Sequence, residues 1–122
     1  MTAAPVPSWR SWLTVAGIAL LLAVLLTLPV AAGPGQRIIG ADRSDVWAHL
    51  WGYWRTEQAL LVHGRFPLAE TALNHPFGGD LYHVDLLNSL LALPLALIVG
   101  RTAAFNLLVW VQLVLAATIT WR

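Results

Sequence analysis

The uncharged stretches WLTVAGIALLLAVLLTLPVAA (residues 12–32) and TAAFNLLVWVQLVLAATITW (residues 102–121) decide the fold of this 122-residue chain. A helix needs about 20 predominantly apolar residues to cross the hydrocarbon core of a bilayer, and both stretches have that length. All six acidic residues and all four histidines lie between them. The pattern predicts an all-α membrane protein in which two transmembrane helices flank one extramembrane loop.

The overall composition supports this class and excludes several others. The chain is 58% hydrophobic and 11% charged, whereas soluble domains carry about 25% charged residues. It has no cysteine and no lysine, so a disulfide framework and a thiolate metal site are excluded. The net charge is +1 without any basic run, which argues against nucleic acid as a partner. No P-loop, Gly-x-Ser-x-Gly, His-Glu-x-x-His or dinucleotide-binding motif is present.

The stretches divide the chain into a leader (1–11), a first span (12–32), an outer loop (33–101) and a second span (102–121). We expect both ends to be cytoplasmic, because a loop of this length translocates largely regardless of its charge. An alternative is a cleavable signal peptide with Val30-Ala31-Ala32 as its cleavage site. Two spans do not enclose a polar cavity in a bilayer, and the chain ends where a helix finishes. Either the chain forms an oligomer, or it is a fragment of a longer polytopic protein, and we expect the fragment.

Two amphipathic interfacial helices are expected within the loop, over about residues 45–62 and 86–99. Ser44 and Asp45 are residue types that cap helix starts, and His63-Gly64 is a typical stop. The first helix has a mostly apolar stripe and a polar or small stripe. The apolar stripe is Trp47, Leu50, Trp51, Trp54, Gln58 and Leu61, and the other is Asp45, His49, Gly52 and Thr56. Tryptophans on an amphipathic helix favour a position in the membrane interface.

Asp45 and His49 are the first candidates for chemistry. Residues four apart share a helix face, so the carboxylate and the imidazole would hold a divalent metal or act together as a base and its orienting partner. Asp42 lies close enough in sequence to join them. The alternative is that Asp45 only caps the helix and His49 only faces water.

A second candidate set lies on the turn-rich part of the loop. It consists of His75, Asp80, His83 and Asp85, which are residue types that bind divalent ions, although polar residues also gather in ordinary turns. Arg55 and Arg65 are candidate phosphate or lipid-headgroup ligands. Asn106 and Gln112 lie within the second span, where polar side chains usually face other helices. These two residues predict contacts with further membrane helices.

Short motifs in this order resemble the amino-terminal part of bacterial polytopic proteins related to the C-type glycosyltransferases, which use lipid-phosphate-linked sugars. The matching segments are SDVWAHLWGYW (44–54), GRFP (64–67), PFGGDL (76–81), LPL (93–95) and AFNL (104–107). The resemblance extends over nearly the whole chain. It implies a multi-pass protein of the bacterial inner membrane, with the loop on the extracytoplasmic side.

The resemblance also implies an activity and a site. In that superfamily an acidic residue of the first outer loop acts as a base or helps to bind a divalent metal such as Mg²⁺ or Mn²⁺, and Asp45 is the matching position. Asp42 is the second choice and His49 a neighbour in the same site. The sugar donor would be a polyprenyl-phosphate-linked sugar, with Arg65 contacting the donor phosphate. Because relatives have many more spans, this polypeptide alone is expected to be inactive.

A non-enzymatic function is the alternative. The chain would then be a small two-span membrane protein that binds a partner through its loop or through the face with Asn106 and Gln112.

Overall fold

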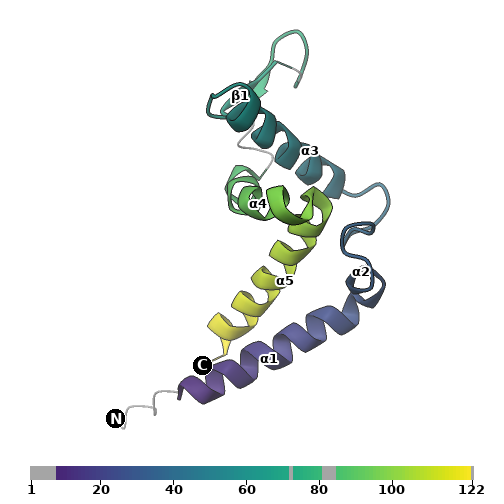
Figure 1. Cartoon of the computed structure of the whole chain (residues 1–122), viewed down its shortest axis with the longest axis vertical. Helices are drawn as coiled ribbons and strands as arrows, with labels where there is room; N and C mark the ends of the chain where they lie inside the picture. Colours follow the sequence, from purple (N-terminus) through teal and green to yellow (C-terminus); the bar gives the residue numbers. More distant parts are fainter. Residues whose placement is uncertain (1–7, 72, 81–84, 122) are drawn as a thin grey trace.

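The computed structural model describes residues 8–71, 73–80 and 85–121, which are mostly helical (Figure 1). In chain order the elements are α1 (Trp9–Leu26), α2 (Leu28–Ala31), α3 (Val46–Glu57), the π-helix η1 (Gln58–Val62), β1 (Ala69–Glu70), β2 (Gly79–Asp80), α4 (Leu86–Val99) and α5 (Arg101–Thr120). Within the described residues, α1 and α5 are each long and apolar enough to cross a membrane.

The two long helices lie side by side and run in opposite directions (Figure 1). At one end of the pair, the rings of Trp12 and Trp121 meet edge to face, with centroids 5.6 Å apart. At the other end of the pair, α3 and α4 lie across the start of α5. The elements that follow α2 in the sequence and precede α5 therefore gather at this end (Figure 1). We call the part formed by α3, η1, the two strands and α4 the head.

The first apolar stretch, expected as one span over residues 12–32, is divided into two helices. α1 begins earlier, at Trp9, because the Ser8 hydroxyl caps it by accepting a bond from the Ser11 amide at 3.3 Å. It ends at Thr27, and the four-residue α2 then begins with Pro29 in its first turn. Proline has no amide hydrogen to donate to the preceding helical turn. The break between the two helices therefore lies where a continuous helix would lose a backbone hydrogen bond.

Asn106 joins α5 to the segment that follows α2. Its side chain is fully buried and forms three hydrogen bonds to that segment. The side-chain nitrogen donates to the carbonyl oxygens of Pro34 and Arg37, each at 2.7 Å, and the side-chain oxygen accepts from the Ile39 amide at 2.9 Å. One amide thus satisfies three backbone groups of a loop that has no regular structure. Such groups cost free energy when they are buried unpaired.

The other polar groups of α5 also find partners within the chain. The Trp110 indole donates to the Thr27 hydroxyl at 2.9 Å, at the break between α1 and α2. The Gln112 side chain donates to Asn88 of α4 at 2.7 Å. Asn106 and Gln112, expected from sequence to face further membrane helices, therefore bond to segments of this chain.

The part of the small and polar stripe formed by Gly52 and Thr56 faces inward, and the other stripe is exposed at Trp47 and half-buried at Trp51 and Trp54. Gly52 and Thr56 are buried, whereas Trp47 is exposed. The core of the head is formed by Val46, Tyr53, Ala92, Ala104 and Phe105. Small side chains allow helix backbones to approach closely, which explains why this face of α3 is the one that packs on α4 and α5. α4 and α5 meet at Gly100, whose φ of +85° suits glycine.

We predict that Asn106→Ala lowers the free energy of unfolding by about 3 kcal/mol, because it removes three part-buried hydrogen bonds and leaves one amide and two carbonyl groups without these partners. Denaturant titration of the protein in mild detergent measures this change. Gln112→Ala is the matched control, since it removes one bond at an exposed position of the same helix. Equal effects of the two substitutions would contradict the role given to Asn106.

Candidate functional site

Asp42 and Asp45 lie in the connection between α2 and α3, and both are exposed. Asp45 occupies the position that caps α3, but its side chain forms no capping hydrogen bond. The connection is shaped by Arg43, with a φ of 62°, and by Gly40, where a Cβ atom would lie 3.1 Å from the Val46 side chain. Both carboxylates are therefore presented to the surroundings at the start of α3 instead of being used to hold the helix.

His49 contacts Asp85 at the start of α4. Its Nδ1 atom lies 3.2 Å from Oδ2 of Asp85. Nδ1 is shielded from solvent and forms no hydrogen bond of good geometry, so the contact is electrostatic and becomes an ion pair when the imidazole is protonated. Sequence reasoning paired His49 with Asp45, its neighbour along the helix. It did not foresee Asp85, which tertiary packing brings to the same place.

The Asp85 carboxylate is also held by Asn88, which is held in turn by Gln112. The side-chain nitrogen of Asn88 donates to both carboxylate oxygens, at 2.7 and 2.8 Å, and Asn88 in turn accepts from Gln112 of α5. Asp85 has a φ of 58°, a conformation that costs energy in a residue other than glycine. The line His49–Asp85–Asn88–Gln112 thus connects α3, α4 and α5 through polar side chains.

Aromatic rings form the apolar side of this polar line. The His49 and Tyr53 rings lie 6.4 and 5.9 Å from the Phe105 ring, measured between centroids. Burial raises the pKa of the Tyr53 phenol well above its ordinary value, and the charge of Asp85 acts in the same direction. Tyr53 is therefore neutral at physiological pH. The charge next to it is that of Asp85 in the polar line.

A buried ion pair attaches the two strands to α3. Arg55 of α3 pairs with Glu70 of β1, and the two side chains are only 14% and 6% exposed. The Arg55 guanidinium also lies 5.2 Å from the centroid of the Trp54 ring. Breaking a buried pair leaves an uncompensated charge, so this contact fixes the strands relative to the helix. Arg55, a candidate phosphate ligand from sequence, is thus engaged within the protein.

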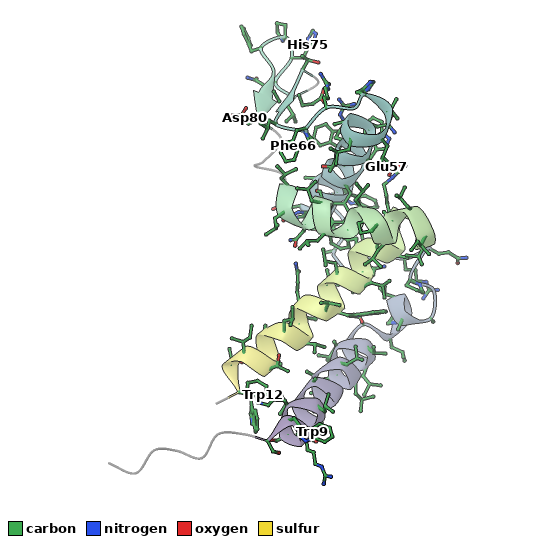
Figure 2. All side chains as sticks on the ribbon, turned by 60° about the vertical axis from the view of Figure 1, so that its left-hand side comes forward. Trp9, Trp12, Glu57, Phe66, His75 and Asp80 are labelled. Carbon is green, nitrogen blue, oxygen red and sulfur yellow. The ribbon has the colours of Figure 1, made fainter. Side chains whose placement is uncertain are left out.

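Arg65 lies at a pocket of about 440 Å³ at the tip of the head. β1 and β2 pair antiparallel, Ala69 opposite Asp80 and Glu70 opposite Gly79, and this hairpin was not foreseen from the sequence. The pocket is lined by Arg65, Ala69, Glu70, Thr71, Phe77, Gly78, Gly79 and Asp80. Figure 2 shows Phe66, His75 and Asp80 at this tip, at the opposite end of the molecule from Trp9 and Trp12.

The second candidate set does not come together as a metal site in the described part of the chain. Asp85 contacts His49, whereas His75 and Asp80 belong to the tip, and His83 lies outside the described residues. Among residues 8–71, 73–80 and 85–121, no three His, Cys, Asp or Glu side chains are grouped to hold a metal ion. Asp45 and His49 lie one helical turn apart, where the His49 amide donates to the Asp45 carbonyl at 3.2 Å.

The chain matches no protein-family model, no curated protein and no solved structure in comparisons with known proteins. The chemistry of the head is therefore inferred from its own geometry. It offers two exposed carboxylates, an imidazole next to a carboxylate, and a separate polar pocket at the tip.

We predict that the free energy of unfolding falls as the pH rises above 10.0, the ordinary pKa of tyrosine, because the folded state binds the Tyr53 proton more tightly than the unfolded state. The chain has no lysine or cysteine and only two tyrosines, so few other groups titrate there. Denaturant titrations between about pH 9 and 11 measure the slope.

Tyr53→Phe should remove most of this slope. A slope that is unchanged in the Tyr53→Phe protein would contradict the assignment.

Proposed function

We propose that the chain is a membrane-anchored module in which α1 and α5 cross the bilayer as an antiparallel hairpin and carry the head on one side. The observation that supports this most is the exposure of α1. Its leucines and Ile18 are 46 to 84% exposed, and Ala23 is its only buried residue. Exposed in water, such a surface would be costly, whereas lipid covers it without cost.

The ends of the hairpin carry residues suited to the two membrane surfaces. Trp9, Trp12 and Trp121 gather at one end, where indole rings favour the interface between lipid and water. At the other end Arg101 pairs with Glu57 at 2.8 Å, next to the head. The antiparallel arrangement would place both chain ends on the same side, which the proposal identifies as the cytoplasmic side of a bacterial inner membrane.

The head would then lie in or on the outer membrane interface. α3 exposes Trp47 and leaves Trp51 and Trp54 half-buried, and α4 exposes Leu87, Leu91, Leu97 and Ile98. Helices with one packed face and one exposed aromatic or aliphatic face partition into the interfacial layer. This position would bring Asp42, Asp45 and His49 close to the level of lipid phosphate groups.

For the activity, we propose transfer of a sugar from a polyprenyl-phosphate donor, with the chain as the amino-terminal part of the transferase. The resemblance of the motifs and the two unengaged carboxylates support it. Asp45, or His49 beside it, would accept the proton of an acceptor hydroxyl as its oxygen bonds to the anomeric carbon. The bond from that carbon to the donor phosphate breaks, and the phosphate takes the electron pair. Asp42 would assist, and Arg65 would bind part of the donor.

A divalent ion would neutralise the leaving phosphate in this reaction. Mg²⁺ is commonly bound by one or two carboxylates together with substrate phosphates. Asp45 and Asp42 match that mode, with His49 as a nitrogen ligand for Mn²⁺. A site made by the protein alone is not supported, since the described residues contain no group of three metal-binding side chains.

Partner binding without catalysis receives less support. It relied partly on Asn106 as an exposed polar group of the second span. The Asn106 side chain is fully buried, and both of its amide hydrogens and its oxygen are used by the loop.

We predict that single cysteines at Ser8 and Thr120 react with a membrane-impermeant maleimide from the same side of the membrane, and cysteines at Ser44 and His63 from the other. The chain has no native cysteine, so each label reports one position. Sealed vesicles of both orientations provide the measurement. Labelling of Ser8→Cys and Thr120→Cys from opposite sides would exclude the hairpin.

We predict that Asp45→Asn lowers the release of polyprenyl phosphate from a polyprenyl-phosphate-linked hexose by about 100-fold or more, because the proton acceptor is lost. Membranes that contain the protein with its native membrane partners are used, and immunoblotting verifies unchanged abundance. His63→Gln, at an exposed position after η1, should retain the rate. Full activity of the Asp45→Asn protein would remove Asp45 from the mechanism.

A further inference from the structure

The pocket at the tip of the head is separate from the carboxylates at the start of α3, and apart from Arg65 its residues take no part in the proposed transfer. It combines three kinds of group within about 440 Å³. Arg65 supplies a planar set of hydrogen-bond donors, Asp80 supplies an exposed carboxylate, and Phe77 supplies an aromatic ring that is 86% exposed. An aromatic ring that protrudes beside charged side chains has an apolar face available for a ligand.

An ion pair and two close backbone approaches shape the walls of the pocket. Glu70 in its wall is paired with Arg55 of α3, which anchors β1 to the helix. Gly78, with a φ of +79°, lies where a Cβ atom would be 3.4 Å from the Glu70 carbonyl oxygen. A Cβ atom on Gly79 would lie 3.2 Å from the Leu73 side chain. The two glycines thus allow the strands to approach and leave bare backbone at the pocket surface.

The charges of the described pocket residues are nearly balanced. Arg65 and Asp80 have opposite charges, and Glu70 is paired with Arg55. A phosphate would meet the repulsion of Asp80, and a metal ion would meet the repulsion of Arg65. A neutral ligand with many hydroxyl groups suits this set better. Carboxylate and guanidinium groups form charge-assisted hydrogen bonds to hydroxyls, and an aromatic ring packs against the C–H face of a sugar ring.

We propose that this pocket binds a sugar ring, with Asp80 and Arg65 hydrogen-bonded to its hydroxyls and the Phe77 ring packed against its apolar face. The proposal goes beyond the transfer reaction, because binding of a free sugar needs neither the lipid donor nor Asp45. It also assigns Arg65 to the sugar instead of to the donor phosphate, the role expected from the sequence.

Saturation-transfer difference NMR tests the proposal. The full chain is placed in phosphatidylcholine nanodiscs, so that no sugar-based detergent competes. The methyl glycosides of glucose, galactose and mannose are the probes, and inorganic phosphate is the competitor. We expect saturation transfer to at least one glycoside, unaffected by phosphate. Absence of transfer to all three, or displacement by phosphate, would overturn the assignment of the pocket to sugars.

Phe77→Ala should weaken glycoside binding by about tenfold, because it removes the ring on which the sugar packs. Phe66→Ala is the matched control: Phe66 is another exposed phenylalanine at the tip, 55% exposed, that does not line the pocket. Both side chains are exposed, so neither substitution is expected to disturb folding, which circular dichroism verifies. Asp80→Asn should also weaken binding. Equal binding by the Phe77→Ala and Phe66→Ala proteins would contradict the proposed contact.

The outcome is independent of the transferase proposal. Loss of polyprenyl-phosphate release in the Asp45→Asn protein bears only on the carboxylates at the start of α3. Glycoside binding that depends on Phe77 would stand even if the chain transferred no sugar, and its absence would leave the assignment of Asp45 untouched.

Discussion

The pairing of the buried Asn106 amide with three backbone groups of the segment after α2 is the interaction on which the rest of the structure depends. The chain must leave its first long helix and return to a second one antiparallel to it, through a segment with no regular hydrogen bonding of its own. Asn106 provides two donors and one acceptor to Pro34, Arg37 and Ile39. These bonds fix where the segment lies against α5. The position of α3, which follows the same segment, is determined from there.

The head is held in place by contacts of three kinds. Small side chains, among them Ala92 and Ala104, allow α3, α4 and α5 to pack closely. Polar side chains then continue from α3 through Asp85 and Asn88 to Gln112 of α5. The ion pair of Arg55 and Glu70 extends the assembly to the strands at the tip. The proposed reacting carboxylates, the His49–Asp85 contact and the tip pocket are thus attached to one helical framework.

The helices that could be predicted from the sequence are those whose own length and composition identify them. The two apolar stretches, and the shorter one over 86–99, appear as helices because length and composition are local properties. The bounds of the first stretch shifted, since Ser8 caps the helix earlier and Thr27 and Pro29 end it sooner than composition indicates. Asn106 was recognised as needing partners. Its actual partners lie in a loop without any pattern, so the sequence offered no means of choosing them.

The candidate site was harder to foresee for the same reason. His49 was paired with Asp45 because helical spacing is visible in a sequence, whereas the contact with Asp85 depends on how α4 packs against α3. The one available signal was an acidic residue at the start of an apolar helix, which is an ordinary capping pattern. The tip pocket forms only when two very short strands pair, and the sequence has no clear pattern for them. Arg65 was therefore identified without the acidic and aromatic residues that line the pocket with it.

The central claim is that α1 and α5 form one antiparallel pair within a single chain, fixed by Asn106. Crosslinking of cysteines placed at Trp12 and Trp121 by a short bismaleimide, which spans the space that the two rings fill, tests it most directly. We expect an intramolecular crosslink, formed less efficiently when Asn106→Ala is added. A crosslink that forms only between two copies of the chain, or with equal efficiency with and without Asn106, would contradict this arrangement.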